Sequence, residues 1–489
     1  SNGGSAGCRG GAGSLIRQLV TATAAVGLVF SLSACAPDPQ TVTNVAPAVS
    51  SFQMPPSETV ILDNGLTLML MPQTEVPLIT VNAVVRAGSV ADHVAGIASI
   101  TAQSLLLGNK LASKQETELL VDSLGASLNA DSGVEGSYIG ADFMTKDAEQ
   151  MLPLLKAVLT GPTFDQTEYS KLLKNKVAAL AQAKESPRAV IGAYFNAQLF
   201  ADHPYGSPSF GDSESLQNMS LQQVRDFYLV HYQPANTALT IAGDFELAEM
   251  KAYVEGLFSD WQGAGAVEAL APEPIEAPNS AKVLLVDKPD AIETTFLIGG
   301  MGISRDNPDF VGLQVINTIL GGRFTSWLND ELRVNSGLTY GARSGFTSFR
   351  DGGTFRISTF TKTSTTEEAI DLALATYARL WEQGIDQATL DSAKAYVKGQ
   401  FPPDYETTGQ LSSLMADMYL FDFGPEFINE FEAKVNGLTL AETERLIDSY
   451  FPRDNLQYVL IGRADAIQDI AAKYGEVRRV DMQAPGFAR

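Results

Sequence analysis

Apolar residues are spaced along the chain in two patterns, one typical of strands and one typical of helices. Residues 66–70 (LTLML) and 79–85 (ITVNAVV) alternate in the manner of half-buried β-strands. Residues 165–183 and 221–231 place apolar side chains every three or four positions, which predicts amphipathic helices. Because strand segments and helical segments each cluster together, the pattern predicts an α+β fold whose antiparallel or mixed sheets are covered by helices on one face.

The same arrangement occurs twice along the sequence. Residues 232–243 (YQPANTALTIAG) and 451–462 (FPRDNLQYVLIG) both place a polar turn before an apolar strand that ends in glycine. The offset is 219 positions for Asn236 and Asn455 and also for Gly243 and Gly462. Two further pairs lie near the start of each half, at offsets of 214 and 216: Gly88 with Gly302 and Gly96 with Gly312. We therefore predict two homologous domains built from one duplicated unit.

A chain of 489 residues is too long for a single hydrophobic core. A segment rich in Pro and Gly (GAGAVEALAPEPIEAPN) lies near the middle and forbids a regular element there. The predicted organisation is a signal peptide at 1–34, a tether at 35–56, a first domain at 57–262, a linker at 263–280, a second domain at 281–475 and a tail at 476–489.

The first 34 residues have the composition of a secretory signal. They contain Arg9 and Arg17, no acidic residue, and an apolar stretch shorter than the roughly 20 residues of a membrane-spanning helix. The stretch ends in Leu-Ser-Ala before Cys35, which resembles the lipobox of bacterial lipoproteins. The resemblance implies a lipid on Cys35 and a place in the cell envelope, on the periplasmic side of the outer membrane because Ala36 is not an acidic retention signal. An uncleaved anchor and a chance cysteine are the alternatives.

The charge of the chain excludes one class of partner. It has 34 Lys and Arg against 57 Asp and Glu, a net charge of −23. Such an acidic surface repels phosphate backbones, so we expect no nucleic-acid binding. The two cysteines are Cys8, inside the predicted signal, and Cys35, so a mature chain has no disulfide framework or thiolate metal cluster.

Two long stretches resemble the pitrilysin/insulinase family of metallopeptidases. Residues 203–244 begin with HPYG, continue with FG and YQPAN, and end in a strand followed by Gly-Asp, similar to the end of that family's first domain. Residues 321–340 carry GGRFTSWL, ELR and GLTY, similar to its second-domain signature. The resemblance runs in order from about Glu58 to Gly462. It implies two homologous domains with the fold of the mitochondrial processing peptidase, each a mostly antiparallel sheet covered by helices.

Active members of that family carry HxxEH on a helix, in which two His bind zinc and the Glu is the base; a further Glu roughly 75 residues later completes the site. The corresponding residues here are Ser99, Ala102 and Gln103, and residues 177–181 (VAALA) offer no carboxylate at the third position. Alanine cannot accept a proton from water, and a Ser/Gln pair is a poor match for Zn²⁺. We therefore expect these positions to be degenerate and the chain to bind no metal.

The histidine count supports the same expectation. The chain has three, His93, His203 and His231, and no two are four positions apart. A site formed by all three in space is disfavoured, because His203 lies in the HPYG turn, where a structural role is expected.

Arg333 and Tyr340 match an Arg/Tyr pair that, in active relatives, faces the zinc from the second domain. The resemblance implies that they bind substrate backbone and stabilise charge on the scissile carbonyl, for which guanidinium and phenol groups are suitable donors. Taken alone, such residues would by default be a surface Arg in an ion pair and a Tyr packed on the core. The flanking GGRF, LR and GLTY favour the functional interpretation.

This combination predicts the non-catalytic, substrate-binding subunit of a heterodimeric zinc metallopeptidase. In two-chain members of the family, one subunit carries HxxEH and the other the Arg/Tyr pair; the partner would supply zinc, and unfolded peptides would bind in extended form at a sheet edge. The chain alone would be inactive. A proteolytically inactive scaffold, like family members of the respiratory chain, is the alternative, and an independent hydrolase has little support.

Overall fold

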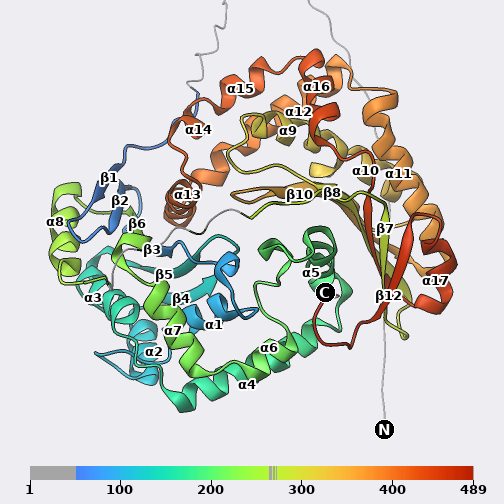
Figure 1. Ribbon diagram of the computed structural model, residues 1–489. Coiled ribbons are helices and arrows are strands. Elements are labelled where there is room, and N and C mark those ends of the chain that lie inside the picture. Colours follow the sequence, from blue (N-terminus) through green and yellow to red (C-terminus); the bar gives the residue numbers. More distant parts are fainter. Residues whose placement is uncertain (1–50, 264–266, 268–269, 271–272, 488–489) are drawn as a thin grey trace, which may run out of the picture. The chain divides into compact units, whose positions relative to one another are not determined.

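Two six-stranded mixed sheets organise the protein, as a computed structural model shows (Figure 1). The structure describes residues 51–263, 267, 270 and 273–487. The predicted signal peptide and Cys35 lie outside the described residues. None of the described helices combines the length and hydrophobicity that a bilayer crossing requires.

The strands of the first sheet, in the order β1-β2-β6-β3-β5-β4, are β1 (Glu58–Ile61), β2 (Thr67–Pro72), β3 (Leu78–Val85), β4 (Ser127–Ser132), β5 (Ser137–Met144) and β6 (Thr237–Gly243). Those of the second, in the order β12-β7-β11-β8-β10-β9, are β7 (Lys282–Asp287), β8 (Glu293–Met301), β9 (Arg343–Ser348), β10 (Gly353–Lys362), β11 (Gln457–Gly462) and β12 (Glu476–Asp481). Five strands of each sheet have the same connectivity, with one parallel pair (β2 with β6, β7 with β11) in equivalent positions. The α+β fold with two homologous halves is confirmed.

The sixth strand of each sheet differs between the halves. The N-terminal strand β1 is antiparallel to β2, whereas β12 is parallel to β7. Residues 476–481 had been expected to belong to a C-terminal tail, and instead they form the edge of the second sheet. In both halves the sixth strand pairs with an edge that would otherwise be free and so satisfies its backbone hydrogen-bonding groups.

One face of each sheet is covered by helices of its own half. In the first half, the strands are contacted by α1 (Ile97–Ser104), α2 (Lys114–Ser123), α3 (Ala148–Thr160) and α8 (Leu247–Phe258), and α4 (Gln166–Ala183), α6 (Ser213–Asn218) and α7 (Leu221–His231) pack on other helices. In the second half, the strands are contacted by α9 (Phe310–Asn317), α10 (Trp327–Asn329), α11 (Thr366–Glu382) and α17 (Ala464–Ala471), and α12 (Gln387–Gln400), α14 (Glu426–Asn429), α15 (Phe431–Gly437) and α16 (Leu440–Tyr450) pack on other helices. The predicted helices α4 and α7 begin where capping residues end the preceding loops, at Asp165 and Ser220.

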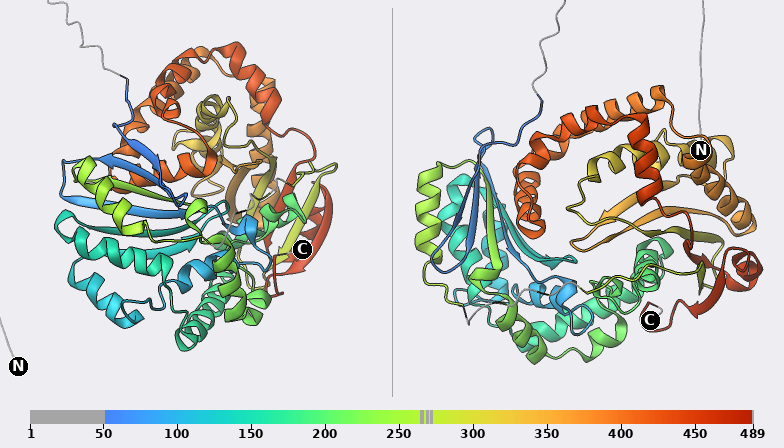
Figure 2. Two further views of the ribbon diagram at one scale, coloured as in Figure 1. Left: turned by 60° about the vertical axis from the view of Figure 1, so that its left-hand side comes forward. Right: turned by 45° about the horizontal axis from the view of Figure 1, so that its top comes forward.

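The opposite face of each sheet is covered by a helix of the other half (Figure 1; Figure 2). Helix α5 (Pro187–Phe200) of the first half packs on β8 and β11, and α13 (Thr408–Phe421) of the second half packs on β3 and β6. Ser412 of α13 is fully buried and hydrogen-bonds to both Thr240 and Asn82. Both faces of each sheet are therefore covered, whereas the sequence had predicted helices on one face.

The exchange of α5 and α13 joins the cores of the two halves. The alternate residues Ile79 and Val81 of β3 face the helices of the first half, while Val84 packs against α13. Leu297 and Val459 of the second sheet belong to the same apolar cluster as α5. Each half therefore buries apolar surface of its sheet against a helix supplied by the other.

The ends of the described chain also pack across the halves. In the last part of the expected tether, the Met54 backbone N–H donates to Asn429 Oδ1 at 2.9 Å, so these residues are docked on the second half. After β12, the Lys184 Nζ group of the first half donates to the carbonyls of Ala484 and Gly486.

One detail of the predicted repeat is wrong. Gly243 and Gly462 end equivalent strands, and Gly88 and Gly302 follow equivalent strands. Gly96, however, is the N-cap of α1 in a left-handed conformation (φ 86°), whereas Gly312 lies inside α9, where a Cβ atom would overlap Leu446. The second glycine is required by packing and the first by the backbone.

Candidate functional site

Helix α1 carries the positions that bind metal in active members of the pitrilysin/insulinase family, which the sequence resembles. It begins at Gly96, and the buried side chain of Asp92 accepts hydrogen bonds from the backbone N–H groups of Gly96 and Ala98 at 2.8 and 3.0 Å. Burial raises the pKa of Asp92 to about 7, against the opposing effect of these two donors. The start of α1 is thus fixed by a carboxyl group beneath it.

Two of the three degenerate positions, Ser99 and Gln103, form a hydrogen-bonded cap with Asp131 of the edge strand β4. Ser99 Oγ donates to Asp131 Oδ1 at 2.7 Å, and Gln103 Nε2 donates to the same oxygen at 3.2 Å and to Ser99 Oγ at 3.3 Å. Ala102 is fully buried. A hydroxyl, a methyl and an amide engaged with one carboxylate are not a zinc ligand set, which needs imidazole, thiolate or several carboxylates.

The segment expected at the third ligand position lies on α4, which packs beside α1. Its residues Val177 to Ala181 are apolar, and only Leu180 among them is buried. Within the ranges that the structure describes, no three His, Cys, Asp or Glu side chains are placed to hold a metal ion.

The histidines are engaged in packing. His203 is buried, and its Nδ1 accepts the backbone N–H of Tyr205 at 3.1 Å, which is the structural role expected in the HPYG turn. His93 and His231 both lie against the ring of Phe227, with centroid separations of 6.4 and 4.4 Å. Burial, with a smaller contribution from His93, lowers the pKa of His231 to about 4.

Arg333 and Tyr340 are both exposed. Within the described residues Arg333 is not in an ion pair and Tyr340 is not packed on the core, so neither has the role expected of such a residue taken alone. Arg333 lies on a π-helical turn (Asp330–Asn335), with its guanidinium carbon 4.8 Å from the ring centroid of Phe324. Tyr340 is 82% exposed, and its ring lies 6.4 Å from that of Phe360, centroid to centroid. Among the described residues neither side chain forms a hydrogen bond or an ion pair, so both polar groups are available to a ligand.

The segment that presents Tyr340 is held on both sides. The backbone N–H groups of Leu338 and Thr339 donate to Leu332 O at 2.9 and 3.2 Å. From β10, Thr359 Oγ1 donates to Thr339 Oγ1 at 3.1 Å and Thr361 Oγ1 donates to Leu338 O at 2.8 Å. The sequence analysis missed these two threonines, although their alternation along β10 was a usable signal.

The exchanged helix α5 adds one further residue, Arg188, that the sequence pattern does not place at this site. The guanidinium carbon of Arg188 lies 3.4 Å from the ring centroid of Phe360, and Arg188 Nη2 lies 3.5 Å from Glu293 Oε2. Phe360 therefore carries Tyr340 from its own half and Arg188 from the other half. Sequence spacing could not place Arg188 here, because the contact depends on the exchange.

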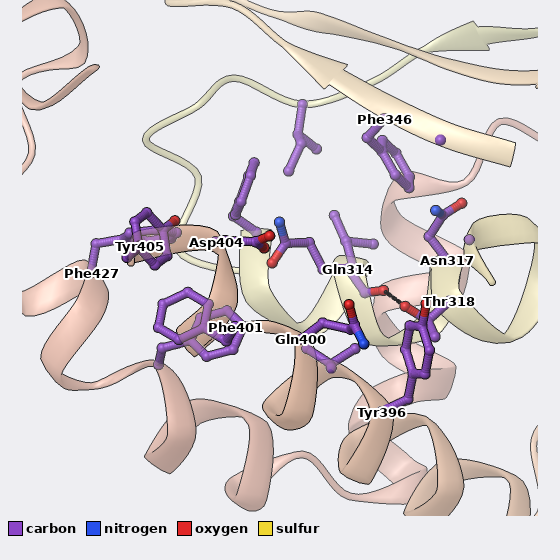
Figure 3. A pocket seen from close by; sticks show the side chains of 17 residues that line it. Gln314, Asn317, Thr318, Phe346, Tyr396, Gln400, Phe401, Asp404, Tyr405 and Phe427 are labelled. Atoms are coloured by element: carbon purple, nitrogen blue, oxygen red, sulfur yellow. Dashed lines mark hydrogen bonds between the residues drawn. The ribbon is translucent and has the colours of Figure 1, made fainter. Parts of the chain in front are cut away.

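A pocket of 320 Å³ lies between α9, α12 and β9 of the second half (Figure 3). Its polar side chains include Gln314, Asn317 and Gln400, and the rings of Phe401 and Tyr405 line the other side. Beside it, the chain turns at Gly321 and Gly322. A Cβ atom on Gly321 would overlap the backbone of Ser344, so glycine at this position allows the two segments to pack closely.

Comparisons with known proteins agree with this geometry. Residues 69–213 match the family described as insulinase (peptidase family M16), and residues 218–397 match the peptidase M16 inactive domain. The chain belongs to peptidase family M16, and Ser99, Ala102 and Gln103 stand at the positions where active members carry the two His and the Glu of HxxEH.

Some similar proteins are named as proteases and others as proteins without peptidase activity. A Helicobacter pylori protein named non-peptidase homolog YmxG is 24% identical over 76% of this chain and 86% of its own length. A Bacillus subtilis protein named uncharacterized zinc protease YmxG is 22% identical over 80% of this chain and 95% of its own length. The crystal structure of a peptidase M16 inactive domain from Pseudomonas fluorescens superposes with a TM-score of 0.78 at 23% identity, covering 83% of this chain and 98% of that one.

Proposed function

We propose that this protein is the non-catalytic, substrate-binding subunit of a heterodimeric zinc metallopeptidase. One observation carries the proposal: Arg333 and Tyr340 are exposed, free of partners among the described residues and mounted on a fixed segment, while the metal positions on α1 are occupied by other chemistry. The pair also keeps the seven-residue spacing and the flanking GGRF, LR and GLTY sequences of the donor pair in active members of the family.

The roles of the two subunits follow from which polar groups this chain keeps. The partner would be a second family member with HxxEH, and zinc would be bound there. Arg333 and Tyr340 would donate hydrogen bonds to the substrate carbonyl, on which negative charge develops during hydrolysis. Preorganised donors at such a site contribute more in an enclosed, water-poor chamber than they do in water.

Substrates would be unfolded peptides that bind in extended form. Strand β4 pairs with β5 on one side and forms the outer edge of the first sheet, next to the cap formed by Ser99 and Asp131. A free edge offers backbone N–H and C=O groups to an added strand, whatever the peptide's sequence. A peptide bound there would satisfy these groups without requiring metal in this chain.

The experiment is co-purification with an HxxEH-bearing family member of the same organism, followed by kinetics on a fluorogenic peptide. Arg333→Gln and Tyr340→Phe should each lower kcat/KM by about 10²-fold, the usual effect of removing one oxyanion donor. The matched controls Arg463→Gln and Tyr253→Phe, at exposed positions on α17 and α8, should leave kcat/KM within about twofold. Full activity of the Arg333 and Tyr340 variants would remove the role assigned to the pair.

An inactive scaffold is the second candidate, supported by the likeness to a relative named as a non-peptidase homolog. It differs in one measurable respect. A scaffold would co-purify with its partner and leave peptide hydrolysis unchanged when Arg333 and Tyr340 are replaced together.

For the location of the subunit, the lipobox-like sequence before Cys35 supports a lipid anchor in the cell envelope. The chain should incorporate radiolabelled fatty acid in a bacterial host and fractionate with membranes. Cys35→Ala should abolish the labelling; label retained in this variant would exclude the anchor.

A further inference from the structure

Three arginines converge on the face of the second sheet that α5 partly covers. Along β10, Arg356, Ser358 and Phe360 point to one face, because successive residues of a strand alternate. Arg343 of β9 is paired with Ser358, so its side chain lies on that same face. Arg188 reaches it from α5.

Arg356 is largely buried without an anion. Its Nε donates to Thr354 Oγ1 at 3.1 Å and its Nη2 to Thr347 Oγ1 at 3.3 Å. Its Nη1 lies against Gly192 of α5, and no carboxylate among the described residues forms an ion pair with it. Burial lowers the pKa of this guanidinium. Besides these hydroxyls the guanidinium carbon lies 5.8 Å from the ring centroid of Phe195, so no partner carries a full negative charge, and an incoming anion would offset the cost of desolvation.

The other two arginines are accessible. Arg343 is exposed and forms no hydrogen bond or ion pair within the part of the chain that the structure describes. Arg188 is about half exposed, and its ion pair with Glu293 is long, at 3.5 Å. Glu293 is thus the one carboxylate that the described residues pair with any of the three, and Lys362 lies opposite it on β10.

This local excess of positive charge stands out on a chain whose net charge is −23. It is also continuous with the proposed substrate site, because the ring of Phe360 contacts both Arg188 and Tyr340. A peptide bound at Tyr340 would therefore lie beside Arg188, on the face that also carries Arg343 and Arg356. Guanidinium groups prefer carboxylates, which accept two parallel N–H bonds.

We propose that Arg188, Arg343 and Arg356 form a subsite for the carboxylates of an acidic peptide segment, alongside Tyr340. This inference rests on the proposed function and names its substrate class: extended peptides that carry Asp or Glu near the bond to be cleaved. The arginines select the peptide, and Arg333 and Tyr340 contact its backbone.

The test is peptide binding to the purified full chain without a partner, measured by fluorescence polarisation. Three labelled peptides of equal length carry Glu, Gln or Lys at the same central positions. The Glu peptide should bind at least about tenfold more tightly than the Gln peptide, the equivalent of one charged hydrogen bond, and the Lys peptide should bind most weakly. Equal affinity for the Glu and Gln peptides would overturn the proposal.

Single substitutions test whether the preference for the Glu peptide arises from the arginines on this face of the second sheet. Arg188→Gln and Arg343→Gln, both at accessible positions, should each weaken binding of the Glu peptide about three- to tenfold and leave the Gln peptide unchanged. Glu293→Gln should strengthen it, because Arg188 is then released, whereas the control Arg463→Gln should have no effect. Glu-peptide affinity that is unaltered in the Arg188 and Arg343 variants would place the carboxylates elsewhere and contradict the proposal.

The two proposals fail in different ways. If Arg333 and Tyr340 matter for hydrolysis by the complex but Glu and Gln peptides bind alike, only the acidic subsite is wrong. If Glu peptides are preferred and hydrolysis does not depend on the pair, the face binds acidic peptides and the catalytic contribution is wrong.

Discussion

The hydroxyl of Ser99 donates a hydrogen bond to Asp131 Oδ1 at 2.7 Å, across the gap between α1 and the edge strand β4. This bond joins the first degenerate metal position to a carboxylate that Gln103 also contacts. The loss of the metal ligands therefore left a satisfied polar network in place of unpaired groups. Such a network stabilises the end of α1 next to the sheet edge at which a peptide is proposed to bind.

Restoring the family's catalytic base should damage this chain. Ala102→Glu would bury a carboxylate at a fully buried position among apolar neighbours, and we expect a loss of about 3–5 kcal/mol in the free energy of unfolding. Urea denaturation measures it. Ala179→Glu, at an exposed position of α4, is the matched control and should change stability by less than about 0.5 kcal/mol. Equal stability of the two variants would show that position 102 has room for the side chain.

The Asp92 carboxyl group should make the free energy of unfolding fall as pH rises. Its pKa in the folded chain is about 7, above the ordinary value of 3.8, so the native state holds the proton more tightly than the unfolded state. Its contribution to stability is then fully present below about pH 4 and is lost as pH rises towards 7. Asp92→Asn, which keeps the shape of the side chain and one of its two acceptor oxygens but does not titrate, should remove this slope in urea titrations at several pH values. An identical slope in the variant would assign it to other groups.

The imidazole of His231 should instead make the free energy of unfolding rise with pH, between about pH 4 and 6.5. Its folded pKa of about 4 lies below the ordinary 6.5, so the unfolded state binds the proton more readily between these values. Its contribution is fully present above about pH 6.5 and is lost as pH falls towards 4. His231→Gln should flatten that acidic limb, as followed by thermal melting in a pH series. The result contradicting this assignment is an acidic limb that is steeper in the variant.

The exchange of helices should make the described chain unfold as one unit. Phe195 of α5 is fully buried in the cluster that includes Leu297 and Val459 of the second sheet. Phe195→Ala should cost about 3–5 kcal/mol and lower a single calorimetric transition. Phe210→Ala, at a ring that is 42% exposed, should cost much less. Two separate transitions, only one of them shifted by Phe195→Ala, would mean that the halves fold independently.

Much of the architecture could be predicted because it depends on short-range spacing. Alternation of apolar residues placed β2 and β3, although both faces of these strands are buried in the structure, and helical periodicity placed α4 and α7. The duplication was visible from asparagines that precede equivalent strands and glycines that end them. The degenerate metal positions followed directly from residue chemistry, because serine, alanine and glutamine lack the required ligands whatever surrounds them.

The candidate site was predictable only in part. The seven-residue spacing of Arg333 and Tyr340 identified the pair, but their freedom from partners depends on the turn pinned by Thr359 and Thr361. Arg188 could not be assigned to the site, since it reaches Phe360 from the other half.

The sequence by itself determined two duplicated α+β units, an α1 without metal ligands and a retained Arg/Tyr pair. The tertiary structure alone decided that α5 and α13 are exchanged and that β12 closes the second sheet. Helix α5 buries residues on most of its sides, which signals a position between two layers but not which layers they are. Hydrophobic burial is non-directional: an apolar helix gains free energy against any apolar sheet face, and only the complete packing of residues more than a hundred positions apart selects one partner.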